Sequence, residues 1–238
     1  MSRRTGGRLG GWTYYDAPIA RTALYMWYVF VVSVLALVTA VPYLAFEALI
    51  GWQRSAVALL AGAVTSGVAG PMVCALVGAM SPLVERREYP GGAPRRFVGA
   101  IRASSPGLRK LWGLVMLSAL LLAFDYAWYG QATVVQVGVA VMALGLFLLL
   151  VAASVICAES DARPARVLEV LIPAGLLLVR RWYVALAWAM LTVVAVALYQ
   201  VPVIGISLLL FLPGLWAACV LIVASAWPIR TREQAYSR

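Results

Sequence analysis

Residues 182–227 read WYVALAWAMLTVVAVALYQVPVIGISLLLFLPGLWAACVLIVASAW and carry no charged side chain. A helix needs about 20 apolar residues to cross the hydrocarbon core of a bilayer, so this stretch is about twice as long as one crossing requires. Gln200, Pro202 and Gly205 lie near its middle, where Pro and Gly favour a turn. The stretch therefore predicts two membrane-spanning helices that fold back on each other.

Four further apolar stretches precede this pair and complete an all-α polytopic membrane bundle of six transmembrane helices. The predicted spans are 23–45, 56–83, 111–126, 133–157, 182–199 and 206–227. They form one membrane domain, 23–227, between a basic N-terminus (1–22) and a C-terminal tail (228–238). The composition agrees, because only 12% of the chain is charged and its mean hydropathy is +0.92, whereas soluble domains carry about 25% charged residues.

Lysine and arginine are confined to one set of loops. All 19 of them except Arg54 lie in 1–22, 84–110, 158–181 or 228–238. Cytoplasmic loops retain these side chains because they resist translocation, so we expect both termini in the cytoplasm. Anionic lipid headgroups then account for the net charge of +10, and we expect no nucleic acid partner.

The chain lacks the residues that most membrane enzymes need. It has no histidine, and its three cysteines lie in or at the edge of separate apolar stretches, so we expect no metal and no cofactor. No base, nucleophile and stabilising donor occur together as a candidate catalytic set. We therefore expect a protein that is not an enzyme; Asp125 and Glu47 alone support the alternative of a membrane enzyme.

Small residues recur at every fourth position of the second span and form one face of a helix. This small-residue stripe consists of Gly62, Ser66, Gly70, Cys74 and Gly78. Such stripes let membrane helices approach closely. They predict packing against another span of the same chain, or an interface with a partner or a second copy. Pro71, beside Gly70, predicts a kink in the middle of this span.

A second interruption is predicted in the sixth span, at Leu212-Pro213-Gly214. Interrupted helices line the cavities of many transporters. Asp125 and Gln136, near the outer ends of the third and fourth spans, supply polar groups to the same candidate cavity as Pro213. A small stand-alone transporter or channel is therefore one predicted function.

Two cytoplasmic connectors combine arginines with an amphipathic pattern, and each predicts a short helix at the membrane interface. Their basic residues, predicted to contact anionic lipid or a cytoplasmic partner, are Arg86, Arg87, Arg95, Arg96, Arg102, Arg109, Lys110, Arg166, Arg180 and Arg181. The likeness between the connectors indicates either a degenerate internal repeat or a chance resemblance of two amphipathic segments.

The stretch GPMVCAL at 70–76, the turn Glu85-Arg86-Arg87 and the segment from Phe97 to Lys110 resemble the YesL-like family of bacterial integral membrane proteins of unknown function. Members of that family often accompany carbohydrate uptake systems of the ATP-binding-cassette (ABC) type. The resemblance implies a non-catalytic accessory role beside ABC permease subunits in the bacterial cytoplasmic (inner) membrane. It implies no site residues.

Overall fold

The computed structural model describes residues 18–86, 91–159, 164–199 and 210–226, and these residues form helices and turns without a strand. The helices are α1 (Pro18–Leu49), α2 (Ala56–Ser66), α3 (Ala69–Arg86), α4 (Ala93–Ala103), α5 (Pro106–Tyr129), α6 (Thr133–Glu159), α7 (Val167–Arg180), α8 (Trp182–Tyr199) and α10 (Leu212–Ala226). The predicted all-α fold is confirmed.

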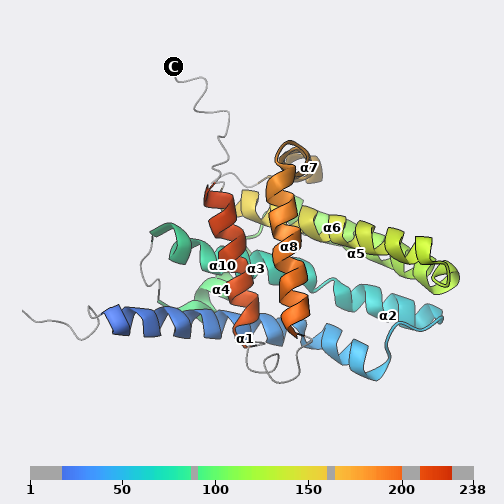
Figure 1. The fold of residues 1–238 in the computed structure, drawn as a ribbon, viewed down its shortest axis with the longest axis horizontal. Coiled ribbons are helices and arrows are strands. Elements are labelled where there is room, and N and C mark those ends of the chain that lie inside the picture. The colour runs from blue at the N-terminus through green and yellow to red at the C-terminus, as the bar shows by residue number, and fades with distance from the viewer. Residues whose placement is uncertain (1–17, 87–90, 160–163, 200–209, 227–238) are drawn as a thin grey trace, which may run out of the picture.

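Helix α3 lies at the centre of the fold, where it contacts α1, α4, α6 and α10. Helices α5 and α6 form a hairpin, while α8 and α10 lie side by side and run crosswise to that hairpin and to α1 (Figure 1). The fully buried side chains of Tyr28, Leu76 and Trp188 come from α1, α3 and α8. The core therefore sits where the crosswise pair meets α1 and α3.

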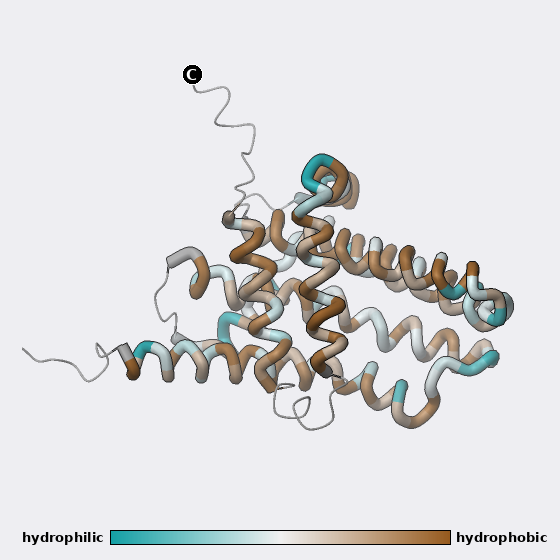
Figure 2. The backbone as a smooth tube through the Cα atoms, in the orientation of Figure 1, coloured by the Kyte–Doolittle hydropathy of each residue, from teal (hydrophilic) through white to brown (hydrophobic). Residues whose placement is uncertain are grey.

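The outer surface is apolar along most of the helices. Figure 2 shows hydrophobic turns throughout, with the polar residues near helix ends and connections. Val134 and Val179 are 84% and 76% exposed, and many other large apolar side chains point outward. Such an extensive apolar surface is unfavourable in water, whereas the interior of a bilayer accommodates it.

Four described segments are long and apolar enough to cross a membrane, and they contain the first four predicted spans. They are Ile19–Leu49, Ala56–Val84, Pro106–Tyr129 and Thr133–Ala158. The chain is thus a membrane-spanning helical protein.

The last two predicted spans have a different form. Helix α8 follows α7 after a bend of 92°, so that the two helices count together as at most one further span. Helix α10 has 15 described residues and is about 22 Å long, shorter than a hydrocarbon core of about 30 Å. The count of six spans therefore stays a prediction.

The second span is interrupted, but not at Pro71. Helix α2 ends at Ser66 and α3 begins at Ala69, so the break falls at Gly67 and Val68. In a continuous helix Pro71 would have no N–H to donate to the Gly67 carbonyl, and its ring would clash with that carbonyl. Both costs disappear when Pro71 lies in the first turn of a new helix, which places the break about one turn earlier than predicted.

Pro213, at the predicted interruption of the sixth span, is the second residue of α10. Residues 206–209, which the prediction included in this span, lie outside the described residues. Ser33 Oγ on α1 accepts a hydrogen bond from Gly214 N at 2.9 Å and donates one to Phe211 O at 3.1 Å. Helix α10 thus starts at the predicted interruption, and α1 caps this start. The earlier part of the predicted span lies outside the described residues, so the position of the interruption within the span stays a prediction.

Helices α4 and α7 form where the two interfacial helices were predicted. Helix α4 buries Phe97 against the fold and leaves Arg95 exposed. Arg109, at the start of α5, donates from Nε to Ser104 Oγ at 3.0 Å and from its guanidinium to Arg102 O at 2.8 Å. These bonds fix the tight turn between α4 and α5.

Helix α7 is capped by Glu169, whose carboxylate accepts from Ala165 N at 3.0 Å and Arg166 N at 3.3 Å. Its buried face consists of Val170, Ala174 and Leu177. The opposite face is also apolar and is exposed, with Leu168, Ile172, Leu176 and Val179 along it. An apolar face on each side suits a helix that rests on the protein and also contacts lipid.

Candidate functional site

The break between α2 and α3 exposes backbone groups that the surrounding segment satisfies. Thr65 Oγ1 donates to Ala61 O at 2.8 Å, and Ser66 Oγ donates to Ala63 O at 2.7 Å. The amide of Gly67 donates to Val64 O at 3.2 Å. Non-helical backbone at membrane depth is tolerated where protein buries it or where it lines a cavity.

A cavity of about 780 Å³ lies against this break and is called the break cavity. Its wall includes the break itself, the last turns of α1, and long faces of α5 and α6. Its lining residues include Tyr43, Glu47, Trp52, Gly70, Trp112 and Tyr126. The volume is within the range of about 300–1,000 Å³ that small-molecule sites occupy.

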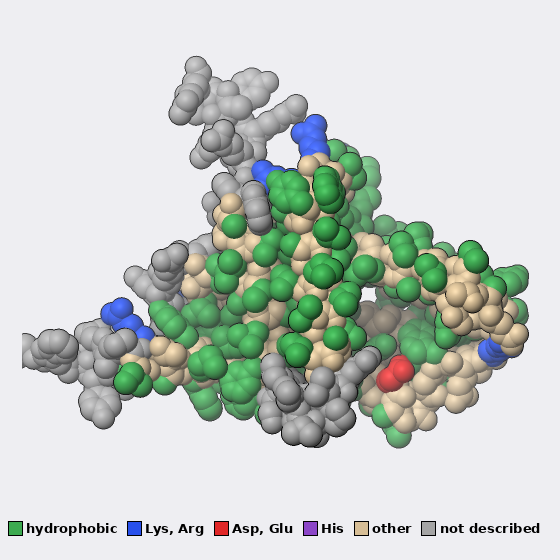
Figure 3. Space-filling model, in the orientation of Figure 1, with side chains coloured by type: hydrophobic (Ala, Val, Ile, Leu, Met, Phe, Trp, Pro, Cys, Tyr) green, Lys and Arg blue, Asp and Glu red, His purple; other side chains and the backbone are tan. Residues whose placement is uncertain are grey.

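The break cavity has aromatic walls and one charge. Glu47 is the one charged residue among its described lining residues. Figure 3 shows a hollow between the α5–α6 hairpin and the end of α1 with α2, with an acidic side chain at its lower rim. Trp52 also packs edge-on against Phe46, with ring centroids 5.2 Å apart, which holds its ring at the wall.

Trp112 closes one end of the break cavity against Gly70. A Cβ atom at Gly70 would lie 2.5 Å from Trp112 Cγ, so only glycine allows this contact without movement of the ring. Trp112 Nε1 is buried and has no hydrogen-bond partner within the described part of the chain. Buried donors are rarely left unpaired; Trp188 Nε1, for comparison, donates to Val220 O at 3.1 Å.

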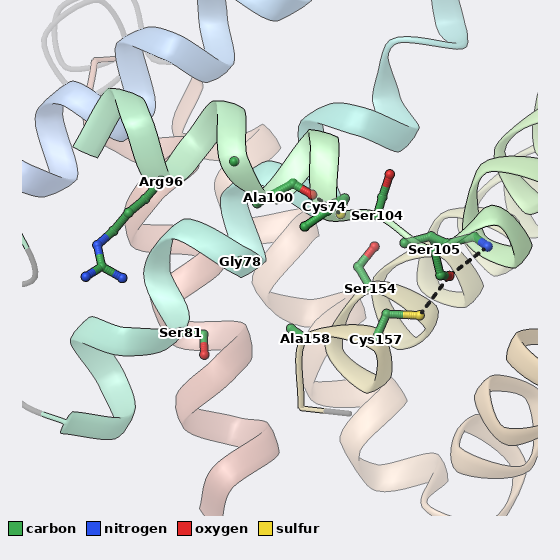
Figure 4. Close-up of a pocket in the computed structure, with 13 residues that line it drawn as sticks. Cys74, Gly78, Ser81, Arg96, Ala100, Ser104, Ser105, Ser154, Cys157 and Ala158 are labelled. Carbon is green, nitrogen blue, oxygen red and sulfur yellow. Dashed lines mark hydrogen bonds between the residues drawn. The ribbon is translucent and has the colours of Figure 1, made fainter. Parts of the chain in front are cut away.

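A second cavity of about 500 Å³, called the thiol cavity, lies between α3, α4, α6 and the start of α5. Figure 4 shows Ser104, Ser105, Ser154 and Cys157 gathered at one end of it, while the guanidinium of Arg96 points away from them. Cys74, Gly78 and Ser81 of α3 also line it.

Three of the six described serine and cysteine side chains that line the thiol cavity donate their proton to a backbone carbonyl. Ser154 Oγ donates to Leu150 O at 2.8 Å, Ser104 Oγ donates to Ile101 O at 2.6 Å, and Cys74 Sγ donates to Ala100 O at 3.8 Å. What these side chains still offer to a ligand is their oxygen and sulfur lone pairs.

Three helices line both cavities, each with residues one turn apart. The pairs, break cavity first, are Gly70 and Cys74 on α3, Trp112 and Leu108 on α5, and Leu150 and Ser154 on α6. Four residues advance a helix by about 6 Å. The two cavities therefore lie end to end along the same three helices, separated by a layer about one turn thick.

The small-residue stripe is covered by the chain's own side chains. A Cβ at Gly62 would lie 2.6 Å from Trp52, and one at Gly78 would lie 2.7 Å from Ala100 Cβ. Ser66 and Gly70 line the break cavity, whereas Cys74 and Gly78 line the thiol cavity. The stripe thus serves packing within the chain and also forms part of both cavity walls.

The described basic residues that were predicted to contact lipid or a partner lie on α4, on or directly beside α7, at the start of α5 and at the end of α3. Those described as exposed are Arg95, Arg96, Arg102, Arg109, Lys110, Arg166 and Arg180. Arg181 is half-buried and makes further polar contacts. Arg86 ends α3, and Arg87 lies outside the described residues. Only Arg96 is among the described residues that line the thiol cavity.

The candidate cavity predicted from Asp125, Gln136 and Pro213 is distinct from the two cavities described above. None of the three is among the described residues that line either cavity. Gln136 instead donates from Nε2 to Gly130 O at 2.7 Å and so caps the end of α5.

The break cavity was not predicted from the sequence, although one sequence pattern indicates part of its wall. Ala40, Tyr43 and Glu47 follow one another at helical spacing, so a single face of α1 carries an aromatic ring and an acid. The contact between Gly70 and Trp112 joins residues far apart in the chain, and no local sequence pattern predicts it.

Comparisons of the chain with models of protein families, with curated proteins and with solved structures find no match. The resemblance to the YesL-like family therefore stays a prediction.

Proposed function

We propose that this protein is a small membrane transporter or channel, and that its solute passes through the break cavity and the thiol cavity. The observation that carries the proposal is the one-turn spacing of the lining residues on α3, α5 and α6. Cavities aligned on three shared helices need only a local movement of the intervening layer to become continuous.

We propose that the thiol cavity faces the cytoplasm and that the break cavity faces the outside of a bacterial cytoplasmic membrane. Arg96 lines the thiol cavity, and Arg109 and Lys110 lie beside it at the start of α5. Arginine and lysine mark the cytoplasmic side of membrane proteins. Both termini then lie in the cytoplasm.

The layer between the cavities is proposed to open at Trp112. Its ring rests on Gly70 in the first turn of α3, and its indole N–H has no hydrogen-bond partner within the described part of the chain. Displacing the ring therefore breaks no hydrogen bond of that side chain, and a polar solute in the layer would supply the missing acceptor.

Solute release from liposomes that hold only this protein tests the proposal. We expect protein-dependent release of at least one of three trapped solute classes, cationic, neutral or anionic. Trp112→Ala should increase that release because it removes the ring from the layer. Trp27→Ala is the matched control, since Trp27 is 59% exposed on α1 and lines neither cavity. No release of any class by the wild type or by Trp112→Ala would contradict the proposal.

A second candidate function is the accessory role in carbohydrate uptake that the family resemblance implies. The exposed apolar face of α7, with Ile172 between Arg166 and Arg180, favours it. Such a face suits either the boundary of an anionic lipid leaflet or a permease subunit.

Purification from the native host in mild detergent, followed by mass spectrometry, tests this second candidate. Stoichiometric permease or ATPase subunits that are lost from an Ile172→Glu variant would support it. A protein that purifies alone would count against it.

A further inference from the structure

We propose that the break cavity binds an organic cation with an apolar body, held by the Glu47 carboxylate at the rim and by the rings of Tyr43, Trp52 and Tyr126. This inference rests on the proposed transport function and names its substrate class.

The charge of the cavity has one sign. Glu47 is its one charged residue among the described lining residues, and no lysine or arginine is among them. Glu47 is exposed, and within the described part of the chain its carboxylate makes no hydrogen bond or ion pair. A carboxylate beside an apolar wall attracts a cation more strongly than it would in bulk water.

The aromatic rings favour the same kind of ligand. Tyr43, Trp52, Trp112 and Tyr126 all line the cavity, and the faces of such rings attract cations as well as apolar groups. Most of the remaining wall consists of Ala, Val, Leu and Met side chains. A neutral sugar would need many paired donors and acceptors that this wall does not offer.

The thiol cavity is compatible with a cation that travels further inward. The thiol proton of Cys74 and the hydroxyl protons of Ser104 and Ser154 are donated to backbone carbonyls, so these three side chains present lone pairs to the cavity. Arg96 is exposed, and its guanidinium points away from Ser104, Ser105 and Cys157 (Figure 4). Solvent therefore screens its repulsion of a cation. An anion would meet the Glu47 carboxylate in the break cavity before it reached the thiol cavity.

The test measures binding rather than transport. Radiolabelled benzyltrimethylammonium is equilibrated with the full-length protein in phosphatidylcholine nanodiscs, with benzenesulfonate as an aromatic anion of similar size and empty nanodiscs as the blank. We expect saturable binding of the cation alone. Glu47→Gln should weaken that binding by about tenfold, an estimate for a partly solvated carboxylate, and Glu47→Asp should retain most of it.

Asp125→Asn is the matched control, because Asp125 is also predicted near the outer face but is not a described lining residue of the break cavity. It should bind the cation as the wild type does. Equal binding of cation and anion, or a Glu47→Gln variant that elutes as a monodisperse peak and binds normally, would overturn the proposal.

The outcomes also separate this inference from the function on which it rests. Selective cation binding without any solute release supports the ligand class and contradicts the transport function. Release of neutral or anionic solutes by a protein that does not bind the cation supports the transport function and overturns the ligand class.

Discussion

At the scale of single residues, the contact between Gly70 and Trp112 decides how the two cavities are separated. The ring occupies the space where any other residue at position 70 would place its Cβ, 2.5 Å from Trp112 Cγ. Glycine in a helix normally costs up to about 1 kcal/mol relative to alanine. The close approach of the ring accounts for glycine at this position.

Gly70→Ala should therefore be destabilising although alanine is the better helix former. Overpacking against a buried ring typically costs about 1–3 kcal/mol, and we expect a lower midpoint of thermal unfolding in nanodiscs. Gly145→Ala on α6 is the control, because a Cβ there would meet no atom within 4 Å. That variant should unfold at or above the wild-type midpoint; a loss as large as that of Gly70→Ala would show that the ring contact is not the cause.

At the scale of elements, the break between α2 and α3 creates the wall of the break cavity. The break exists because Pro71 cannot donate to the Gly67 carbonyl in a continuous helix. The hydroxyls of Thr65 and Ser66 then satisfy carbonyls at the end of α2.

Pro71→Ala should allow α2 and α3 to join and should reduce solute release from liposomes. Hydrogen exchange at residues 67–71 should slow in this variant, because the amide at position 71 gains a helical partner. Pro82→Ala provides the control, since Pro82 lies inside α3 and is not a described lining residue of the break cavity. Slower exchange with unchanged release would separate the break from the transport path.

The sequence predicts helices far better than it predicts cavities, for a physical reason. Hydrophobic stretches locate α1, α5, α6 and α8 because each of these helices consists of one continuous apolar segment of the chain. A cavity depends on which side chains of distant helices meet, as Trp112 meets Gly70. The break was predicted at Pro71 and lies one turn before it, since the proline ring would clash with the carbonyl four residues earlier, that of Gly67.

At the scale of the whole molecule, the number of spans predicted from the sequence differs from the number that the helix lengths supply. The distribution of lysine and arginine predicts six spans with both termini inside. The described helices supply four spans, or five if α7 and α8 count as one. The two span counts differ because of α8 and α10. These helices run crosswise to α1 and to the α5–α6 hairpin (Figure 1).

Labelling of introduced cysteines resolves this difference. Residues 200–205 lie outside the described part of the chain, and the charge distribution predicts them to be external. In a cysteine-free background, Gln200→Cys in intact cells should react with a membrane-impermeant maleimide as readily as Gln53→Cys, in the predicted loop after the first span. Protection of Gln200→Cys, with Gln53→Cys labelled, would contradict the six-span topology.

The claim central to this account is that solute passes through both cavities, and native cysteines allow a direct test. Cys157 lines the thiol cavity, whereas Cys219 is not among the described residues that line either cavity. Proteins that retain only one of these cysteines are placed in liposomes, and a charged methanethiosulfonate is applied to each side while solute release is measured. The account predicts that modification blocks release through the Cys157 protein from its cytoplasmic side and leaves the Cys219 protein unaffected. Unchanged release, with mass spectrometry showing Cys157 fully modified, would contradict it.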